Sequence, residues 1–172
     1  TLRIDSEADD NINSLCHDFL HVIGRTAYDK YGDFNKAVIY HQDFCNSGYI
    51  HGLFESYFRS NKDPFKNLAK MCEYSADVRA FDRWQCQHGI GHGLMYYTAG
   101  DVGESLDICE SALSEEATID CRNGVVMELW NSELLAKEPD FINKNNPLKT
   151  CENMSIAKTE CYVYVPVYMH QT

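Results

Sequence analysis

A short phrase that begins with cysteine and carries glycine three residues later recurs along this chain. It reads CNSGYIHG from Cys45, CQHGIGHG from Cys86 and CRNGVVME from Cys121. The phrases start 41 and then 35 residues apart, and Cys161 follows after 40 more as a copy without the glycines. Periods of this length are typical of paired-helix repeats. The sequence therefore predicts an all-α fold of stacked helical hairpins.

A second cysteine stands before each later phrase and closes a short amphipathic stretch. These are Cys72, Cys109 and Cys151, which lie 14, 12 and 10 residues before the next cysteine. Each unit is thus interpreted as helix A, cysteine, loop, cysteine, helix B. A bridge across each loop would stabilise the fold by about 3 kcal/mol in the chain-entropy model. The repeat predicts the pairs Cys72–Cys86, Cys109–Cys121 and Cys151–Cys161, and elimination leaves Cys16–Cys45.

Metal ligands and reduced core thiols are the alternatives for the eight cysteines. Structural zinc sites usually bring cysteines in pairs about two to four residues apart, and no such pair occurs here. Four disulfides are favoured, and they indicate an oxidising compartment, either extracellular or periplasmic and cell-envelope. The chain begins at Thr1 rather than Met, as expected of a processed mature chain or an excised domain.

The length of 172 residues fits a single helical-repeat domain, residues 1–172. Apolar periodicity predicts the first helix through Leu15, Phe19, Val22, Ile23 and Ala27. Loops are expected where glycine, proline and asparagine gather. We expect an N-terminal helix over about 9–31 and repeat units over about 33–60, 63–98, 101–133 and 140–170. No alternating strand pattern is convincing, although Tyr162 to Val167 is β-prone.

The layout resembles disulfide-linked α/α repeat proteins of the Sel1-like, cysteine-rich type, in which every helical hairpin carries its own bridge. The resemblance is architectural. Those repeats space their cysteines more closely and lack the histidine-glycine phrase of this chain. It implies the stacked-hairpin fold and transfers no functional residue.

Charge and hydropathy limit the partners. The formal net charge of −11 repels nucleic acid at long range and attracts cations. No apolar run approaches the roughly 20 residues of a membrane helix, and the longest, Tyr162 to Met169, contains Pro166. We therefore expect no nucleic-acid partner and no membrane insertion, with a protein partner on the repeat surface as an open alternative.

The histidines are the candidate chemical groups. They form pairs four residues apart, namely His17 with His21 and His88 with His92, while His51 stands four residues before Glu55. Residues four apart share one face of a helix, with Cβ atoms about 6 Å apart, so that two side chains can bind one ion. His51 and His92 also occupy the same repeat position, which Met127 takes in the third unit beside Glu128. Equivalent positions of stacked repeats line one surface.

The sequence accordingly predicts a site for a transition-metal ion near the starts of the second helices. The predicted metal ligands are His17, His21, His51, His88 and His92. Glu55 and Glu128 are further ligands or, in an enzyme, general bases. Gly48 with Gly52 and Gly89 with Gly93 would make small helix faces that let backbones and imidazoles approach closely.

The competing interpretation is that these glycines only permit tight packing and that the histidines fill polar gaps in the core. A buried histidine bound to a carboxylate or carbonyl is a satisfied structural group. His41 and His170 are interpreted in this way.

Imidazoles with one carboxylate suit zinc or non-haem iron, and a thioether such as Met127 or Met95 would favour copper. Calcium and magnesium prefer oxygen ligands and are disfavoured. Copper or zinc is expected, with iron as the alternative.

Three functions from different classes fit these residues. The first is a secreted or envelope protein that binds copper or zinc. The second is a metal-dependent enzyme, either a phosphoester hydrolase or an oxidase-type site, with a glutamate as base. The third is a helical-repeat interaction module without metal. Metal content and turnover distinguish the three.

Overall fold

The computed structural model describes residues 10–42, 44–73, 80–131 and 141–171. Within these ranges every regular element is helical and no strand occurs, which confirms the all-α prediction. The elements are α2 (Asp10–Tyr31), α3 (Phe34–Val38), η1 (Cys45–Ser47), α4 (Gly48–Ser60), η2 (Leu68–Lys70), α5 (Ala80–Tyr97), α6 (Val102–Ala112), α7 (Glu115–Asn131), α8 (Pro147–Asn153) and α9 (Lys158–Gln171).

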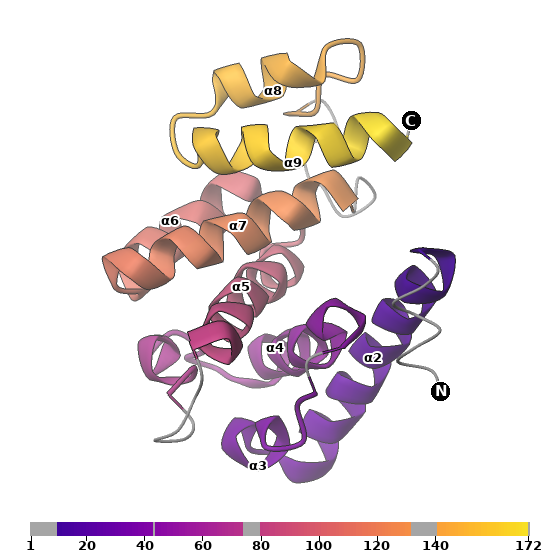
Figure 1. The fold of residues 1–172 in the computed structure, drawn as a ribbon. Coiled ribbons are helices and arrows are strands. Elements are labelled where there is room, and N and C mark those ends of the chain that lie inside the picture. Colours follow the sequence, from indigo (N-terminus) through magenta and orange to yellow (C-terminus); the bar gives the residue numbers. More distant parts are fainter. Residues whose placement is uncertain (1–9, 43, 74–79, 132–140, 172) are drawn as a thin grey trace.

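The long helices pack in chain order. Helix α2 contacts α4, α4 contacts α5, α5 contacts α7, and α7 contacts α9, while the shorter α3, α6 and α8 flank this row. Figure 1 shows the resulting stack, from α2 and α3 at one end to α8 and α9 at the other. Each inner helix therefore buries side chains against both the helix before it and the helix after it.

Four disulfides join the pairs that the repeat predicts: Cys16–Cys45, Cys72–Cys86, Cys109–Cys121 and Cys151–Cys161. No described cysteine is free. The first bridge ties α2 to η1, the turn directly before α4, and the last two tie α6 to α7 and α8 to α9. The predicted pairing is confirmed, and it holds the helices of each hairpin together.

The position of the cysteines within the units differs from the expected pattern. Cys86 and Cys121 lie well inside α5 and α7 rather than ahead of them. The stretch that ends at Cys72 forms only the 3-10 turn η2 instead of a first helix. A disulfide needs only that the two Cα atoms lie close together. They are 5.6 Å apart in the second bridge and 5.9 Å apart in the third. The bridges therefore do not require cysteines at helix ends.

The first phrase is the one that begins a helix. Cys45, Asn46 and Ser47 all have positive φ, between 50° and 56°, immediately before α4. Non-glycine residues in this region cost about 1–3 kcal/mol each. The corresponding residues after Cys86 and Cys121 are helical. Cys45 therefore ends a sharp turn that directs its carbonyl oxygen toward α2.

Turns separate the helices where the sequence predicts them. Gly32 and Gly100 adopt φ of 61° and 85° in the turns that follow α2 and α5, a conformation that glycine takes at little cost. Asp33 and Asp101 cap the helices that come next, because their side chains accept hydrogen bonds from backbone N–H groups of the first turn. The β-prone segment 162–167 lies in α9.

Helix α2 is apolar on two faces. Its inner face buries Cys16, Leu20 and Tyr28 against α4 and neighbouring elements. Most of the periodic residues that predict the helix lie on the opposite, exposed face, with exposed fractions of 71% for Leu15 and 57% for Phe19. The apolar pattern thus predicts the helix correctly but marks the wrong side as buried, because glycine and histidine occupy much of the contact with α4.

Candidate metal centre

Seven side chains of four helices meet where α2, α4, α5 and α7 cross. Helix α2 contributes His17 and His21, α4 contributes His51 and Glu55, α5 contributes His88 and His92, and α7 contributes Glu128. The helical spacing of four residues brings the members of each pair onto one face. The structure therefore brings together all five histidines and both glutamates that the sequence singles out.

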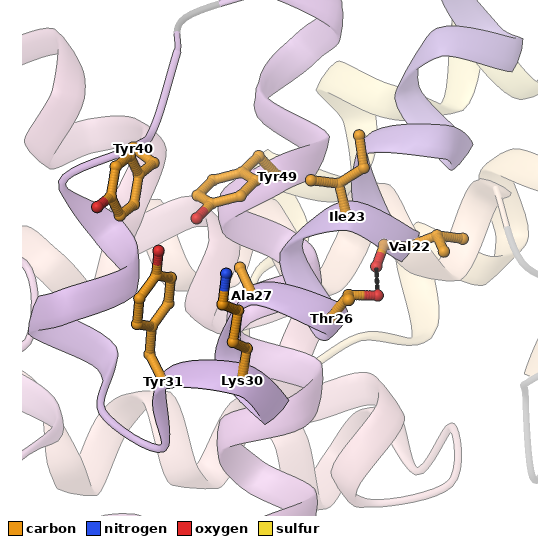
Figure 2. A pocket seen from close by; sticks show the side chains of 8 residues that line it. All are labelled: Val22, Ile23, Thr26, Ala27, Lys30, Tyr31, Tyr40 and Tyr49. Atoms are coloured by element: carbon orange, nitrogen blue, oxygen red, sulfur yellow. Dashed lines mark hydrogen bonds between the residues drawn. The ribbon is translucent and has the colours of Figure 1, made fainter.

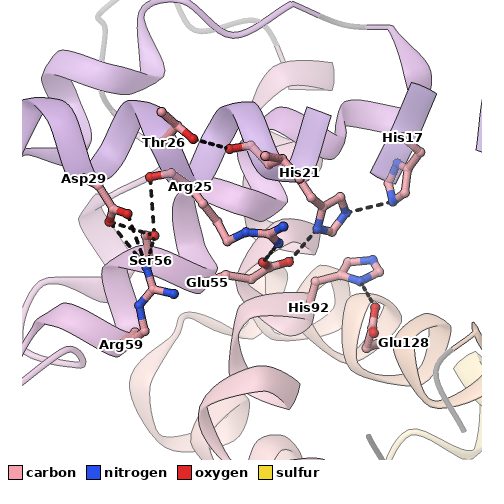
Figure 3. A network of polar contacts seen from close by, with 11 residues as sticks. His17, His21, Arg25, Thr26, Asp29, Glu55, Ser56, Arg59, His92 and Glu128 are labelled. Carbon is pink, nitrogen blue, oxygen red and sulfur yellow. Dashed lines mark hydrogen bonds and ion pairs between the residues drawn. The ribbon is translucent and has the colours of Figure 1, made fainter. Parts of the chain in front are cut away.

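The first half-site consists of His17, His21 and Glu55. His17 donates from Nδ1 to the carbonyl oxygen of Cys45 at 2.9 Å, and His21 donates from Nδ1 to Oε1 of Glu55 at 2.5 Å. The other oxygen of Glu55 pairs with Nη1 of Arg25. The two Nε2 atoms of His17 and His21 face each other at 3.0 Å (Figure 3).

The second half-site consists of His88, His92 and Glu128. His92 donates from Nδ1 to Oε2 of Glu128 at 2.6 Å, and its Nε2 lies 3.1 Å from Nε2 of His88. Figure 3 shows the ring of His92 below those of His17 and His21, with Glu128 below His92. The arrangement repeats the first half-site, since a histidine pair on one helix is supported by a glutamate from the next long helix.

His51 lies between the half-sites. Its ring centroid is 5.2 Å from that of His17 and 5.3 Å from that of His21, and it stacks on His92 at 4.2 Å. The residue is only 1% exposed, and neither ring nitrogen has a hydrogen-bond partner. Buried polar groups are paired in the great majority of cases, so this imidazole calls for an explanation.

Two groups of three histidines have the spacing of metal ligands. One comprises His17, His21 and His51, the other His51, His88 and His92, and in each the candidate ligand atoms lie within 4.8 Å of one another. His51 belongs to both groups. These residues can hold a transition-metal ion with imidazole nitrogens.

Glycines let the helices approach at the histidine backbones. A Cβ at Gly52 would meet the carbonyl oxygen of His21 at 2.1 Å, and a Cβ at Gly124 would meet that of His88 at 2.0 Å. Gly48 makes the same kind of contact with His17. The predicted close approach at Gly48 and Gly52 is therefore confirmed, and it sets the depth at which each histidine pair lies.

Glycines of α5 serve the contact with α4. A Cβ at Gly93 would meet Cβ of Phe54 at 2.7 Å, whereas one at Gly89 would lie 3.2 Å from Cδ2 of His51. The predicted small face formed by Gly89 and Gly93 is confirmed as well. It allows the ring of His51 to lie against α5 beside His88 and His92.

Burial keeps three of the imidazoles neutral, those of His17, His51 and His88. It lowers the pKa of His17 from 6.5 to about 4, with the neighbouring His21 as the second cause. Burial and the surrounding histidines lower the pKa values of His51 and His88 well below 6.5. Neutral imidazole is the form that binds metal ions. His17, His51 and His88 are thus in the form that a metal ion would bind.

The glutamates act on histidines in this structure. Each accepts a hydrogen bond from a histidine Nδ1, an arrangement that fixes the tautomer and orientation of metal-binding imidazoles in many proteins. The pKa of Tyr96 is raised to about 12, first by burial of the phenol and then by the charges of Glu55 and Glu128. Tyr96 therefore lies within electrostatic reach of both glutamates. Service of Glu55 or Glu128 as a general base remains a prediction.

Two contacts of the site were not predicted. Arg25 holds the second oxygen of Glu55, and the carbonyl of Cys45 holds His17. Arg25 stands four residues after His21 and so shares its helix face, a spacing visible in the sequence. The carbonyl contact depends on the turn before α4 and leaves no sequence signal.

The sequence also offers His41, His170, Met95 and Met127 as candidates. His41 belongs to neither group of three, and the side chain of His170 lies outside the described residues. Met95 is buried in the core, and Met127 is half-buried beside Glu128. Glu128 rather than Met127 reaches a histidine in the third unit.

A separate hollow lies on the outer side of α2. Its volume is about 340 Å³, and Val22, Ile23, Ala27, Tyr31, Tyr40 and Tyr49 supply most of its walls, with Lys30 as its charged residue (Figure 2). Tyr49 donates its hydroxyl hydrogen to the carbonyl of Ala37, and Tyr31 stacks on Tyr40. This hollow contains no candidate metal ligand. A protein partner on the repeat surface remains a prediction.

Comparisons with protein-family models, with curated proteins and with solved structures found no match to the chain. Within the described residues, no helix combines the length and the apolar character needed to cross a membrane. Interpretation of the histidine cluster therefore depends on its own geometry and chemistry.

Proposed function

We propose that this chain is a secreted or cell-envelope protein that binds copper or zinc through the histidines of α2, α4 and α5. Four disulfides indicate an oxidising compartment. The extracellular space and the periplasm both meet that condition. The histidine groups supply imidazole ligands, which suit copper and zinc and disfavour calcium and magnesium.

The observation that carries this proposal is the way in which Nε2 of His17 and Nε2 of His21 face each other. A carbonyl and a carboxylate can only accept, so both imidazoles carry their hydrogen on Nδ1. Both Nε2 atoms then present lone pairs to each other across 3.0 Å. Two lone pairs at that distance repel unless a cation lies between them. The lowered pKa of His17 disfavours a proton there.

The spacing of these nitrogens suits two ligands of one ion. With metal–nitrogen bonds of about 2.0–2.1 Å, neighbouring ligand atoms on one ion lie roughly 3.0–3.4 Å apart. The Nε2 atoms of His17 and His21 are 3.0 Å apart, and those of His88 and His92 are 3.1 Å apart. Both pairs thus have the spacing of neighbouring ligands before any movement.

Elemental analysis tests the proposal directly. The protein is purified without a histidine tag or chelator and compared with the double variant His51→Ala, His92→Ala. We expect stoichiometric copper or zinc in the protein and its loss from the variant, while His41→Ala, a histidine outside the cluster, retains the metal. Absence of metal from the folded protein after reconstitution with Cu(II) and with Zn(II) would refute the proposal.

A metal-dependent enzyme is the second candidate. Three histidines with a vacant fourth position are the ligand set of many catalytic zinc sites, and each group of three here leaves that position to water or substrate. Hydrolysis of a chromogenic phosphate ester by the zinc-loaded protein, or oxidation of a phenol by the copper-loaded protein, would support this function. The double variant must abolish the activity. Metal binding without turnover would contradict the enzymatic function and leave metal binding as the proposed function.

A further inference from the structure

The two half-sites share one basic arrangement, which bears on the number of ions that they hold. Each has a histidine pair on one long helix, a glutamate from the next, and a glycine that brings the two backbones together. In each, a carboxylate takes the Nδ1 hydrogen of one histidine and leaves Nε2 for a metal. Neither half-site borrows its supporting carboxylate from the other.

One ion cannot use all five imidazoles in their present positions. The ligand atoms fall into two groups, and neither group includes histidines of both pairs. His17 and His21 lie on α2, and His88 and His92 lie on α5, with α4 packed between them. His51 of α4 is the histidine that reaches both groups.

An imidazole offers two nitrogens on opposite sides of its ring. Both nitrogens of His51 are buried without a hydrogen-bond partner, which distinguishes it from His17, His21 and His92, whose Nδ1 atoms are engaged. A histidine that ligates one ion still needs an acceptor for its remaining N–H. Within the described residues, His51 has none.

From these contacts we infer that the cluster holds two divalent transition-metal ions, one in each half-site, and that His51 bridges them through its two ring nitrogens. The inference rests on the proposed metal binding. When both ions are bound, two metal–nitrogen bonds form at His51, its N–H bond breaks, and the proton passes to water. The resulting imidazolate separates the ions by about 6 Å, from metal–nitrogen bonds of about 2.0–2.1 Å.

The charges of the site suit two ions. Glu55 and Glu128 each bring a carboxylate next to a metal-binding imidazole, and the imidazolate adds a third negative charge between the ions. Arg25, which pairs with Glu55, cancels one of these charges, so that together the groups offset half of the charge of two divalent ions. The net charge of −11 of the chain acts in the same direction.

Titration of the metal-free protein with Cu(II) tests the inference. We expect binding to saturate at two copper ions per chain. Two Cu(II) ions joined by an imidazolate couple their unpaired electrons, so the electron paramagnetic resonance signal of the first equivalent should fall as the second binds. Saturation at one copper ion, or two ions with an undiminished signal, would overturn the inference and leave metal binding in place. No bound copper would overturn the proposed function itself.

Matched variants separate the two half-sites. His17→Gln with His21→Gln should leave one copper ion in the second half-site, and His88→Gln with His92→Gln should leave one in the first, each with an uncoupled signal. Loss of all copper from both double variants would indicate one shared ion and overturn the inference. Far-UV circular dichroism confirms that each variant is folded.

The bridge has its own variant. His51→Gln keeps a polar side chain of similar volume but cannot join two ions through one ring. We expect weaker copper binding and no loss of signal as copper is added. Coupling as strong as in the unmodified protein would overturn the bridging role of His51. His41→Ala should match the unmodified protein in both stoichiometry and coupling.

Discussion

In the first half-site both histidines donate from Nδ1, to the Cys45 carbonyl and to Glu55, and Arg25 holds the second oxygen of that glutamate. In the second half-site only His92 is held in this way, and the buried Nδ1 of His88 has no partner. The same repeat unit thus has two degrees of completion. Hydrogen bonds thus orient both histidines of the first half-site, whereas in the second they orient His92 alone.

Exposure separates the half-sites as well. His17 and Arg25 are partly exposed, while His88 and His92 are buried. An ion from solvent would therefore reach the first half-site nearer the surface of the stack than the second. We expect the first half-site to fill faster.

The largest expected effect comes from pushing the paired helices apart. Gly52→Ala would place a methyl group 2.1 Å from the carbonyl oxygen of His21, and Gly124→Ala would place one 2.0 Å from that of His88. Backbone atoms cannot move away as a side chain can, so each variant should lose about 3 kcal/mol or more of unfolding free energy. Denaturant unfolding measures the loss, and each variant should also lose metal from its own half-site.

Gly103→Ala is the matched control. It lies in α6, where a Cβ would meet only Oδ1 of Asp101 at 3.6 Å. Alanine is favoured over glycine in a helix by up to about 1 kcal/mol, so this variant should be as stable as the parent or slightly more so. If Gly52→Ala and Gly124→Ala are equally tolerated, the close packing described for both half-sites is wrong.

Acid should destabilise the metal-free protein. The folded state lowers the pKa of His17 to about 4 and those of His51 and His88 well below 6.5, so the unfolded chain binds more protons as the pH falls below 6.5. The stability that these three neutral histidines contribute is therefore fully present above pH 6.5, and it is lost as the pH falls below 6.5. The slope approaches about 1.4 kcal/mol per pH unit for each histidine that stays neutral. Thermal unfolding between pH 8 and pH 4 measures it.

Two variants sharpen this comparison of the half-sites. His17→Gln should reduce the acid sensitivity between pH 6.5 and about 4, where the folded His17 itself takes up its proton. His88→Gln should reduce the acid sensitivity below pH 6.5 as well, because burial holds the pKa of His88 well below 6.5. A slope unchanged by both substitutions would show that neither histidine is kept neutral by the fold.

The cysteine repeat made the fold predictable. Disulfide pairing follows from the spacing of Cys72, Cys109 and Cys151 before their partners, and the structure has those bridges. Helix boundaries were less accessible, because a cysteine within a helix bridges as well as one at its end. The buried face of α2 could not be read from hydrophobicity, since its contact with α4 uses Gly24, Gly48 and Gly52.

The members of the site were predictable, but their grouping was not. Spacing of four residues identifies His17 with His21 and His88 with His92, and the shared repeat position adds His51. The pairing of each glutamate with a particular histidine depends on how neighbouring helices cross, which periodicity does not encode. The division into two half-sites around His51 follows from that crossing and emerges only in three dimensions.

The smallest expected effect tests how each carboxylate supports its histidine. Loss of such a partner usually costs about 10–100-fold in metal affinity. Glu55 accepts hydrogen bonds at both oxygens, from His21 and from Arg25, so Glu55→Gln must turn its amide NH₂ group toward one of these donors. At Glu128, glutamine can keep its carbonyl oxygen on the Nδ1 hydrogen of His92, but it loses the carboxylate charge. We expect a loss of about 10–100-fold for each of the two variants.

Competition titrations with a chromogenic zinc chelator measure both losses of affinity. Each substitution should weaken the binding of the zinc ion in its own half-site. Glu110→Gln is the control, because Glu110 pairs with Arg122 away from the cluster and should leave zinc affinity unchanged. Zinc affinity unchanged by both Glu55→Gln and Glu128→Gln would show that neither carboxylate orients its histidine.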